Sequence, residues 1–563
     1  METRTCQNCK QSFTIDTDDF AFYDKLKVPA PTFCPDCRFQ RRLMFRNERV
    51  FYWRECELCH QKVLSIFSPE RGFHVLCNKC WWTDEWDPGA TYLDYDPNRN
   101  FFDQLKELQE KTFWMQKVVD YATVKNSEYI NHAGSIKDSY LVFTADFCEN
   151  VYYGSTLAHV KDSADLLMGM EVELVYGTIG GSGSSRCYFS NNCSSCVNVW
   201  YSLECIGCTD CFGCVNLRNK SHCIYNEQYT KEEYDKKIAE MELDKHSSHE
   251  KIRTHVYNEV WKKFPMRYVH GRMNLNSTGE YVFRSKNAKN CYQALVEDCA
   301  YVQFITLPPV KDTYDYTDWG NGVERCIDVT NTGEGAFEVK YSAMTWGNIR
   351  NQDFCFFALG CNDVFGCVNL RKKQYCILNK QYTKEEYEKL RAEIIADLEK
   401  NPYVDSKGRI SKYGDFMPYD LSPFAYNESF ATQYFPMTKE EIEANGFRWI
   451  EPTKPNYTET IQLADIPDSI KDIPDTFSNE ILKCTCGKYY RIVPGELELL
   501  KRFGIPVPRQ CPDCRHMGRI RMLRGFRLYD RTCDNCGKAV KSSFKAGSEE
   551  RVFCEECYQR EVV

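Results

Sequence analysis

The chain lacks a long apolar run and an excess of positive charge. No stretch approaches the ~18 apolar residues of a membrane-spanning helix, and the N-terminal residues METRTCQNCKQSF contain no apolar signal core. The net charge is −8, so nucleic-acid binding would require a local basic patch. We therefore expect a cytoplasmic protein with no membrane segment.

Common catalytic motifs are also missing. The glycine-rich stretch GTIGGSGSS (177–185) lacks the Gly-Lys-Ser/Thr ending of a P-loop and does not fit Gly-x-Gly-x-x-Gly. The sequence contains no His-Glu-x-x-His, and His132, His159 and His222 are isolated. We identify no catalytic residue, and an enzyme with an unrecognised site is the least favoured interpretation.

Cysteine is abundant: the 563 residues include 32 cysteines. In a cytoplasmic protein these predict thiols or metal ligands rather than disulfides. Eight lie in residues 6–80, sixteen in 148–376 and eight in 484–557. The length itself predicts several domains.

The two outer groups of cysteines match each other. Both consist of four close pairs, and the gaps between successive pairs are the same in the two groups. One constant shift along the chain superposes seven of the eight cysteines, so that Cys9 falls on Cys486 and Cys80 on Cys557. The first pair of the second group departs, since it reads Cys484-Thr485-Cys486. This pattern indicates an internal duplication of a module of about 80 residues.

Each module supplies eight thiolates, enough for two tetrahedral zinc sites of four cysteines. We expect about four zinc ions per chain and favour sequential pairing of the knuckles, with a cross-braced pairing as the alternative. The shortened Cys484–Cys486 knuckle predicts a strained or weaker site. The expected ligands are Cys6, Cys9, Cys34, Cys37, Cys56, Cys59, Cys77, Cys80, Cys484, Cys486, Cys511, Cys514, Cys533, Cys536, Cys554 and Cys557.

Residues 484–515, CTCGKYYRIVPGELELLKRFGIPVPRQCPDCR, resemble the zinc-ribbon family: a cysteine knuckle, aromatics, an acidic helix, then Arg-x-Cys-Pro-x-Cys-Arg. Residues 6–38 match less fully, with Thr32 in place of Arg509. The whole arrangement is similar to large bacterial proteins with zinc modules flanking cysteine-rich repeats. The resemblance implies zinc binding and no particular activity.

The central region is duplicated as well. DCFGCVNLRNKSHCIYNEQYTKEEYDKK (210–237) matches DVFGCVNLRKKQYCILNKQYTKEEYEKL (363–390). In the first copy, short aromatic or β-branched pieces recur at every twelfth position. Such a period predicts a β-solenoid. Thr230 to Glu233 and Thr383 to Glu386 are capping boxes that predict capping helices.

The predicted fold is therefore multidomain and mainly β: a duplicated β-solenoid-like repeat region with capping helices, flanked by two small zinc-ribbon-type modules. The expected segments are module A (1–88), a helical connector (89–126), the first repeat region (127–226), capping and connecting helices (227–279), the second repeat region (280–379), a capping helix (380–400), an extended linker (401–480) and module B (481–563).

The central cysteines allow two interpretations. Cys193, Cys196, Cys205, Cys208, Cys211 and Cys214 could form an iron–sulfur or further zinc site. When the two copies of the central region are aligned, however, Cys205 falls on Ala358 and Cys211 on Val364. Small core residues exchange in this way and metal ligands do not, so we favour core packing.

An arginine-rich stretch follows each CPDCR motif. Arginines that keep their register between the modules are expected to neutralise the zinc–thiolate charge: Arg38, Arg42, Arg54, Arg515, Arg519 and Arg531. Those that do not are candidates for phosphate contacts, with aromatics between them for base stacking: Arg41, Arg46, Arg49, Arg521, Arg524 and Arg527.

Two non-enzymatic functions follow. The arginine-rich stretches favour binding of nucleic acid, either RNA or single-stranded. The acidic net charge and Trp81, Trp82 and Trp86 instead favour a zinc-stabilised scaffold with protein partners.

Overall fold

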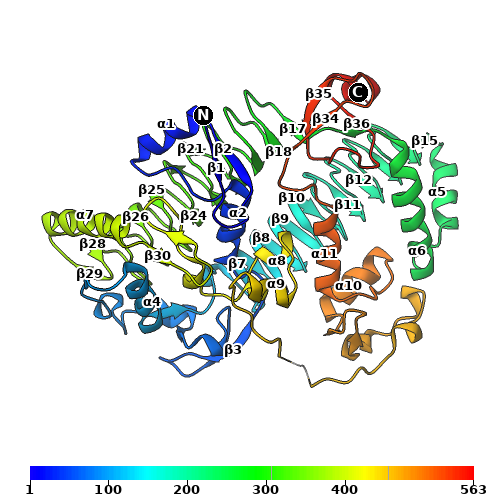
Figure 1. Cartoon of the computed structure of the whole chain (residues 1–563). Helices are drawn as coiled ribbons and strands as arrows, with labels where there is room; N and C mark the ends of the chain where they lie inside the picture. The colour runs from blue at the N-terminus through cyan, green and yellow to red at the C-terminus, as the bar shows by residue number, and fades with distance from the viewer. Residues whose placement is uncertain (306, 454–455, 563) are drawn as a thin grey trace. The chain divides into compact units, whose positions relative to one another are not determined.

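A computed structural model describes residues 1–305, 307–453 and 456–562. Residue 306 of the second repeat region, residues 454 and 455 of the expected linker and residue 563 of module B lie outside the described part. The fold is mainly β, with several helices and multiple sheets (Figure 1). It divides into two compact units, which are unit 1 (1–117, 269–451, 526–528) and unit 2 (118–268, 452–525, 529–563).

Each unit combines a cysteine module with a repeat region from elsewhere in the chain. Unit 1 holds module A and the second repeat region, whereas unit 2 holds the first repeat region and nearly all of module B. Module A contains β1 (Glu2–Thr5), β2 (Ser12–Ile15), α1 (Thr17–Leu26), α2 (Pro35–Met44), β3 (Tyr52–Glu55), β4 (Lys62–Ser65), β5 (His74–Leu76) and α3 (Asn78–Trp81). Module B contains β32 (Leu482–Lys483), β33 (Tyr489–Tyr490), α10 (Pro494–Phe503), α11 (Pro512–Met522), β34 (Tyr529–Thr532), β35 (Ala539–Ser542), β36 (Val552–Phe553) and α12 (Glu555–Val562).

The first repeat region lies in a nine-stranded sheet in which neighbours in the chain are neighbours in the sheet. Cys187, Val199, Cys211 and Cys223 align in parallel across four strands, so the strands have the same period as the sequence. The strands are β7 (Ile130–Lys137), β8 (Val142–Tyr152), β9 (Ser155–Ala164), β10 (Leu167–Glu173), β11 (Ser185–Tyr188), β12 (Val197–Trp200), β13 (Thr209–Phe212), β14 (Ser221–Ile224) and β15 (Glu227–Gln228).

The second repeat region pairs in the same parallel way, but its register step varies slightly, from Tyr292 with Gln303 to Thr317 with Thr330. It forms a six-stranded and a seven-stranded sheet. The strands are β17 (Gly271–Arg272), β18 (Gly279–Phe283), β19 (Cys291–Ala294), β20 (Gln303–Ile305), β21 (Val310–Lys311), β22 (Thr317–Gly320), β23 (Val323–Glu324), β24 (Thr330–Gly333), β25 (Phe337–Lys340), β26 (Arg350–Asp353), β27 (Asn362–Phe365), β28 (Gln374–Ile377) and β29 (Lys380–Gln381).

A second, shorter period explains the composition of these regions. A positive φ recurs at every third residue over long stretches, for example at Asn192 (52°), Ser195 (54°) and Asn198 (54°). Asparagine, aspartate and glycine tolerate this left-handed conformation best, so they recur at these positions. We call each of these positive-φ residues a corner, and the residue after a corner is often buried, as Cys193 and Cys196 are.

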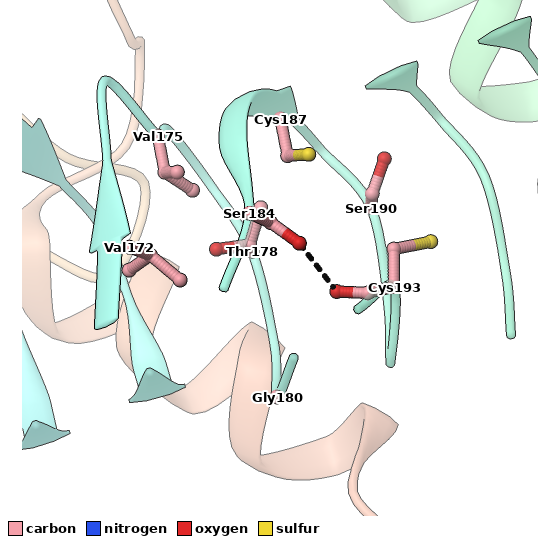
Figure 2. Close-up of a pocket in the computed structure, with 8 residues that line it drawn as sticks. All are labelled: Val172, Val175, Thr178, Gly180, Ser184, Cys187, Ser190 and Cys193. Atoms are coloured by element: carbon pink, nitrogen blue, oxygen red, sulfur yellow. Dashed lines mark hydrogen bonds between the residues drawn. The ribbon is translucent and has the colours of Figure 1, made fainter. Parts of the chain in front are cut away.

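Small polar side chains suit this interior because they satisfy the backbone. The Ser202 hydroxyl donates to the Trp200 carbonyl at 2.9 Å and accepts from the Cys214 N–H at 3.0 Å. Buried polar groups require such partners. A cavity of about 10 Å³ lies in this interior. Figure 2 shows its lining residues, which are Val172, Val175, Thr178, Gly180, Ser184, Cys187, Ser190 and Cys193.

Helices follow both repeat regions at the predicted places. Thr230 and Thr383 form capping boxes with Glu233 and Glu386 and open α5 (Lys231–Glu240) and α7 (Lys384–Lys400). The other helices outside the modules are α4 (Phe101–Lys111), α6 (His246–His255), α8 (Ala431–Tyr434) and α9 (Lys439–Ala444), and the remaining strands are β6 (Phe113–Met115), β16 (Met266–Arg267), β30 (Tyr403–Val404) and β31 (Ile410–Ser411).

The segment expected to be an extended linker is packed instead. Phe416, Leu421 and Tyr426 are fully buried in unit 1, and Ile470 and Phe477 are buried in unit 2. Aromatic and aliphatic side chains without periodicity can still fill the space between other elements, so the missing period did not indicate exposure.

Candidate metal centres and arginine clusters

Four groups of four cysteine sulfurs each lie within 4.8 Å of one another. Their pairing is sequential, since in both modules the first knuckle joins the second and the third joins the fourth. The second cysteine of every group is exposed, and the others are buried except Cys514, which is half-buried. The groups are Cys6, Cys9, Cys34 and Cys37; Cys56, Cys59, Cys77 and Cys80; Cys484, Cys486, Cys511 and Cys514; and Cys533, Cys536, Cys554 and Cys557.

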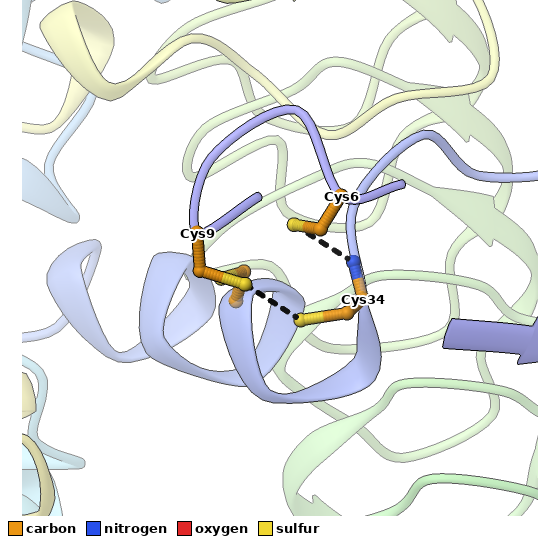
Figure 3. A group of neighbouring side chains, drawn as sticks. Cys6, Cys9 and Cys34 are labelled. Carbon is orange, nitrogen blue, oxygen red and sulfur yellow. Dashed lines mark hydrogen bonds between the residues drawn. The ribbon is translucent and has the colours of Figure 1, made fainter. Parts of the chain in front are cut away.

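Each group is built from a β-hairpin and a helix start. In the first group, the chain after β1 supplies Cys6 and Cys9, and Cys34 is the N-cap of α2. The Cys34 N–H donates to the Cys6 sulfur at 3.3 Å (Figure 3). The corresponding bond recurs in the other groups at 3.2, 3.3 and 3.2 Å. A helix N-terminus and backbone N–H groups favour the thiolate form that metals bind.

The sulfur–sulfur distances fit a shared metal ion. Four sulfurs held at ~2.3 Å from a tetrahedral zinc ion lie about 3.8 Å apart. Cys9 and Cys34 lie 3.7 Å apart, Cys59 and Cys77 lie 3.9 Å apart, and the Cys536–Cys554 distance is 3.7 Å. A disulfide would require ~2.05 Å. The donor set and spacing therefore suit a tetrahedral, thiolate-preferring ion such as zinc.

The shortened knuckle also assembles. Cys484 lies 3.8 Å from Cys514, and Cys486 lies 3.7 Å from Cys511. The residue after the second cysteine has a positive φ here as elsewhere: Gly487 at 88°, where Lys10 has 60°. The Gly487 N–H donates to the Cys484 carbonyl at 2.8 Å, where Lys10 donates to Cys6, so this turn closes one residue earlier. The strain expected from the missing residue does not open the group.

The first cysteine of each group in module B has an acidic thiol. Burial raises the pKa of Cys484, but N–H groups of Cys486 and Cys511 outweigh it and lower the pKa to about 6. The same balance, with N–H groups from Cys554 and Cys536, lowers the pKa of Cys533 to about 6. Both thiols thus ionise below their usual value near 9.

The central cysteines behave differently. All sixteen are buried, whereas each group of the modules includes an exposed cysteine. The Cys214 thiol donates to the Phe212 carbonyl at 3.4 Å. Within the described ranges, the groups of side chains close enough to share an ion are the four of the modules. These observations favour core packing over an iron–sulfur or further zinc site.

The arginines of α2 pair with aspartates of the second repeat region. Arg38 Nε donates to Asp315 at 2.8 Å, and Arg42 Nη1 donates to Asp328 at 2.7 Å. All four side chains are at most 3% exposed. Arg38 and Arg42 were expected to neutralise zinc–thiolate charge, but the carboxylates are their partners. The shared register of these arginines in the two modules is therefore explained by their ion pairs with aspartates.

Module B repeats this arrangement in unit 2. Arg515 lies 3.0 Å from Asp165 of the first repeat region, and Arg519 lies 3.0 Å from the same carboxylate. Glu496 of α10 is 2.9 Å from Arg515 and fully buried. A tyrosine ring lies beside the guanidinium in each unit: Tyr153 is 4.8 Å from Arg515, and Tyr301 is 5.3 Å from Arg38.

Arg54 and Arg531 brace their own modules. Arg54 donates to the carbonyls of Phe73 (2.7 Å) and Ser68 (3.3 Å). Arg531 donates to the carbonyls of Glu550 and Lys545. The shift that superposes the two arginines also superposes these acceptors, so the interaction is common to both modules. In each case the arginine holds the loop before the last knuckle.

The candidate phosphate-binding arginines separate into two sets. Arg41 and Arg46 are each 1% exposed; Arg41 pairs with Asp328 at 3.0 Å, and Arg46 pairs with Glu48 and Asp318. The expectation that these two face a nucleic acid is wrong, because a buried and paired guanidinium cannot reach a phosphate.

The other four candidates lie nearer the surface. Arg49 is half-buried. Arg524, also half-buried, donates to the Arg267 carbonyl at 2.8 Å. Arg521 is exposed, and the exposed Arg527 pairs with Asp36.

The aspartates that receive the arginines were missed in reasoning from the sequence. Asp165, Asp315 and Asp328 each occupy a corner of the three-residue period, with φ of 58°, 62° and 48°. A search for acidic residues at corner positions would have found these three aspartates. It would also have found acidic residues at other corners, several of which are exposed.

Comparisons with known proteins add no identity. No family model matches the chain, and no curated protein matches it in sequence. The zinc-ribbon resemblance therefore rests on the four cysteine groups. No helix of the described residues has the length and apolar character needed to cross a membrane.

Proposed function

We propose that the protein is a non-enzymatic, zinc-stabilised binding scaffold. In each unit a zinc-ribbon module is fixed to a β-solenoid, and four structural zinc ions hold the two modules. Support for the solenoids comes from the nearly constant parallel register of the strands in both repeat regions. Support for structural zinc comes from four-cysteine groups, which leave no open coordination position for catalysis.

The main support for the proposal is that the arginines after each CPDC knuckle form buried ion pairs. The side chains that suggested a phosphate-binding face instead fasten a module to a repeat region, through Arg38 and Asp315 in unit 1 and Arg515 and Asp165 in unit 2. Their burial favours a rigid scaffold over nucleic-acid binding by the arginine-rich stretches.

Zinc counting on the full chain tests the proposal. Elemental analysis is expected to find about four zinc ions per chain, and a strong chelator should remove the metal and lower the melting temperature together, since zinc binding supplies folding energy in such modules. Cys37→Ser and Cys514→Ser, one variant per module, should each remove about one ion. Iron in place of zinc, or zinc removal without a change in melting, would contradict the structural role.

The arginine-rich stretches have a separate test. Arg521→Ala and Arg527→Ala alter the exposed candidates without touching a buried pair. A scaffold of the kind proposed should bind single-stranded RNA equally well with and without these changes. A large, salt-dependent loss of RNA binding in these variants would instead support nucleic-acid binding by the arginine-rich stretches.

A further inference from the structure

Unit 1 has a surface pocket of about 360 Å³ that the scaffold role does not explain. It lies between the end of module A and the last turns of the second repeat region. Its size falls in the range of small-molecule sites, ~300–1,000 Å³. The lining residues are Trp82, Asp84, Trp86, Asp87, Pro88, Arg371, Lys372 and Lys373.

One part of this region is structural. Trp81 is fully buried, and the Arg371 guanidinium lies 5.1 Å from its ring and 5.0 Å from that of Trp86. Arg371 also donates to the Thr83 carbonyl at 3.1 Å. Burial lowers the pKa of Arg371, and Asp84 and Asp87 oppose this effect. The carboxylates of Asp84 and Asp87 therefore stabilise the charged form of the Arg371 guanidinium.

Unit 2 provides an internal control. The duplication places Tyr558 at the position of Trp81 and Arg218 at that of Arg371. Tyr558 is likewise buried, and its hydroxyl donates to Asn216 at 2.8 Å. The packing of an aromatic beside the repeat region is thus common to both units, and its role is to join module and repeat region.

The remaining groups of the pocket differ between the units. Gln559 stands where unit 1 has Trp82, and Asn219 stands where unit 1 has Lys372. Trp82 packs against Trp81, with ring centroids 4.9 Å apart, and lies 6.0 Å from the Arg371 guanidinium, yet it remains 37% exposed. Unit 1 therefore carries an exposed indole and an additional cation that the shared packing does not require.

The charges of the pocket leave two ammonium groups available. Within the described ranges, no ion pair involves Lys372 or Lys373. Lys372 is exposed, and the half-buried Lys373 runs beside Gly89, where an added Cβ would lie 3.5 Å from its Nζ. One oxygen of the nearby Asp87 carboxylate accepts from the Gly89 N–H at 2.9 Å.

We propose that this pocket binds one nucleotide unit. An exposed indole ring offers a stacking surface for a base of any sequence, and two unpaired ammonium groups attract its phosphate. The site goes beyond the scaffold role and uses none of the arginine-rich stretches. The same chemistry is present in a free nucleotide and in a single strand of RNA or DNA.

The test measures binding of a fluorescein-labelled ten-nucleotide uridine RNA to the full chain by anisotropy at low salt. Trp82→Ala is expected to weaken binding about tenfold, within the ~1–3 kcal/mol that stacking of one base contributes. Lys372→Ala with Lys373→Ala should weaken it similarly and reduce the salt dependence. Lys220→Ala, at the position in unit 2 that matches Lys373, should leave binding unchanged.

Competition identifies the source of the nucleotide. Displacement of the RNA by uridine monophosphate supports a mononucleotide site, whereas displacement only by unlabelled RNA or DNA strands supports a strand-binding site. Absence of RNA and nucleotide binding, or equal binding by the wild type and the pocket variants, would overturn the proposal. Zinc content and melting temperature of the same variants should stay at wild-type values, so a failure of the scaffold proposal is recognised separately.

Discussion

Substitution of Arg38 distinguishes docking from zinc neutralisation. Arg38 is 3% exposed at its side chain, pairs with Asp315 at 2.8 Å, and donates to the Phe33 carbonyl at 2.8 Å. Arg38→Ala leaves the Asp315 carboxylate, which is 1% exposed, with Arg42 at 3.4 Å as its remaining ion-pair partner. Breaking a buried ion pair costs about 3–5 kcal/mol when the remaining charge has no partner, and the Arg42 contact places the expected loss at the lower end of this range.

A matched control joins the same two parts of unit 1. Lys25 of α1 pairs with Asp312 of the second repeat region at 2.6 Å, but these side chains are 44% and 31% exposed. Exposed pairs contribute about 0–1 kcal/mol, so Lys25→Ala should have a small effect. The difference between the two variants therefore measures burial rather than the presence of a salt bridge.

Urea unfolding of the full chain, followed by tryptophan fluorescence, gives the free energies, and elemental analysis gives the zinc content. We expect Arg38→Ala to unfold at lower urea with about four zinc ions retained before unfolding. Adding Asp315→Ala to Arg38→Ala should recover part of the loss, because the buried carboxylate that lost its shorter ion pair is removed and Arg42 still pairs with Asp328. Zinc loss at unchanged stability would refute the docking interpretation and restore the neutralising role.

Other buried groups give three further predictions. His249 is buried, its Nδ1 lies 2.5 Å from the Tyr201 hydroxyl, and burial lowers its pKa from 6.5 to about 4. The free energy of unfolding should fall by up to about 3 kcal/mol as the pH decreases from 6.5 to 4, because the unfolded chain binds the proton first. His249→Gln should flatten the dependence of the urea midpoint on pH over that range. Cys208→Ser should keep about four zinc ions and Cys511→Ser about three, as counted by elemental analysis; zinc loss from the first would indicate a metal site in the repeat region. Gly181→Ala should lower the melting temperature more than Gly183→Ala, although both residues have a positive φ. At Gly181 the added Cβ would lie 2.2 Å from the Cys193 carbonyl oxygen, whereas at Gly183 it would lie 3.8 Å from Ser195 Oγ. Equal effects would mean that the backbone conformation alone determines the loss of stability.

The cysteine ligands were predictable because the spacing within each pair determines where its two sulfurs point. Two residues between cysteines turn both sulfurs toward one ion, and the order of knuckles recurs in both modules. The sequential choice was the more local one, and Cys34 and Cys77 lie at helix starts that the following residues specify. Little information from distant parts of the chain was needed.

The arginine partners were not predictable in this way. Arg38 and Asp315 lie in different halves of the chain, and no local pattern distinguishes this aspartate from others at corners. Burial of an arginine is also contrary to the usual expectation for a charged residue. An arginine-rich stretch therefore suggested a solvent-exposed face.

The repeat regions were partly predictable. The longer period of the sequence is the spacing of aligned strands, as for Thr209 and Ser221. The three-residue period was missed because Cys, Ser and Val alternate at the buried positions, and no single residue type marks them. Their common property is small volume, combined with a thiol or hydroxyl that bonds the backbone in the cases of Cys and Ser.

The duplication gives the docking interpretation its strongest support. In each unit an arginine after a CPDC knuckle lies beside a tyrosine ring and pairs with an aspartate further along the chain. These residues are Tyr301 and Asp315 in unit 1, and Tyr153 and Asp165 in unit 2. A residue kept only for the zinc charge would need no such matching partners. Because module A docks with the second repeat region and module B with the first, a cut of the chain at residue 268 would part each module from its aspartate. Both buried charge clusters therefore depend on segments from opposite halves of the chain.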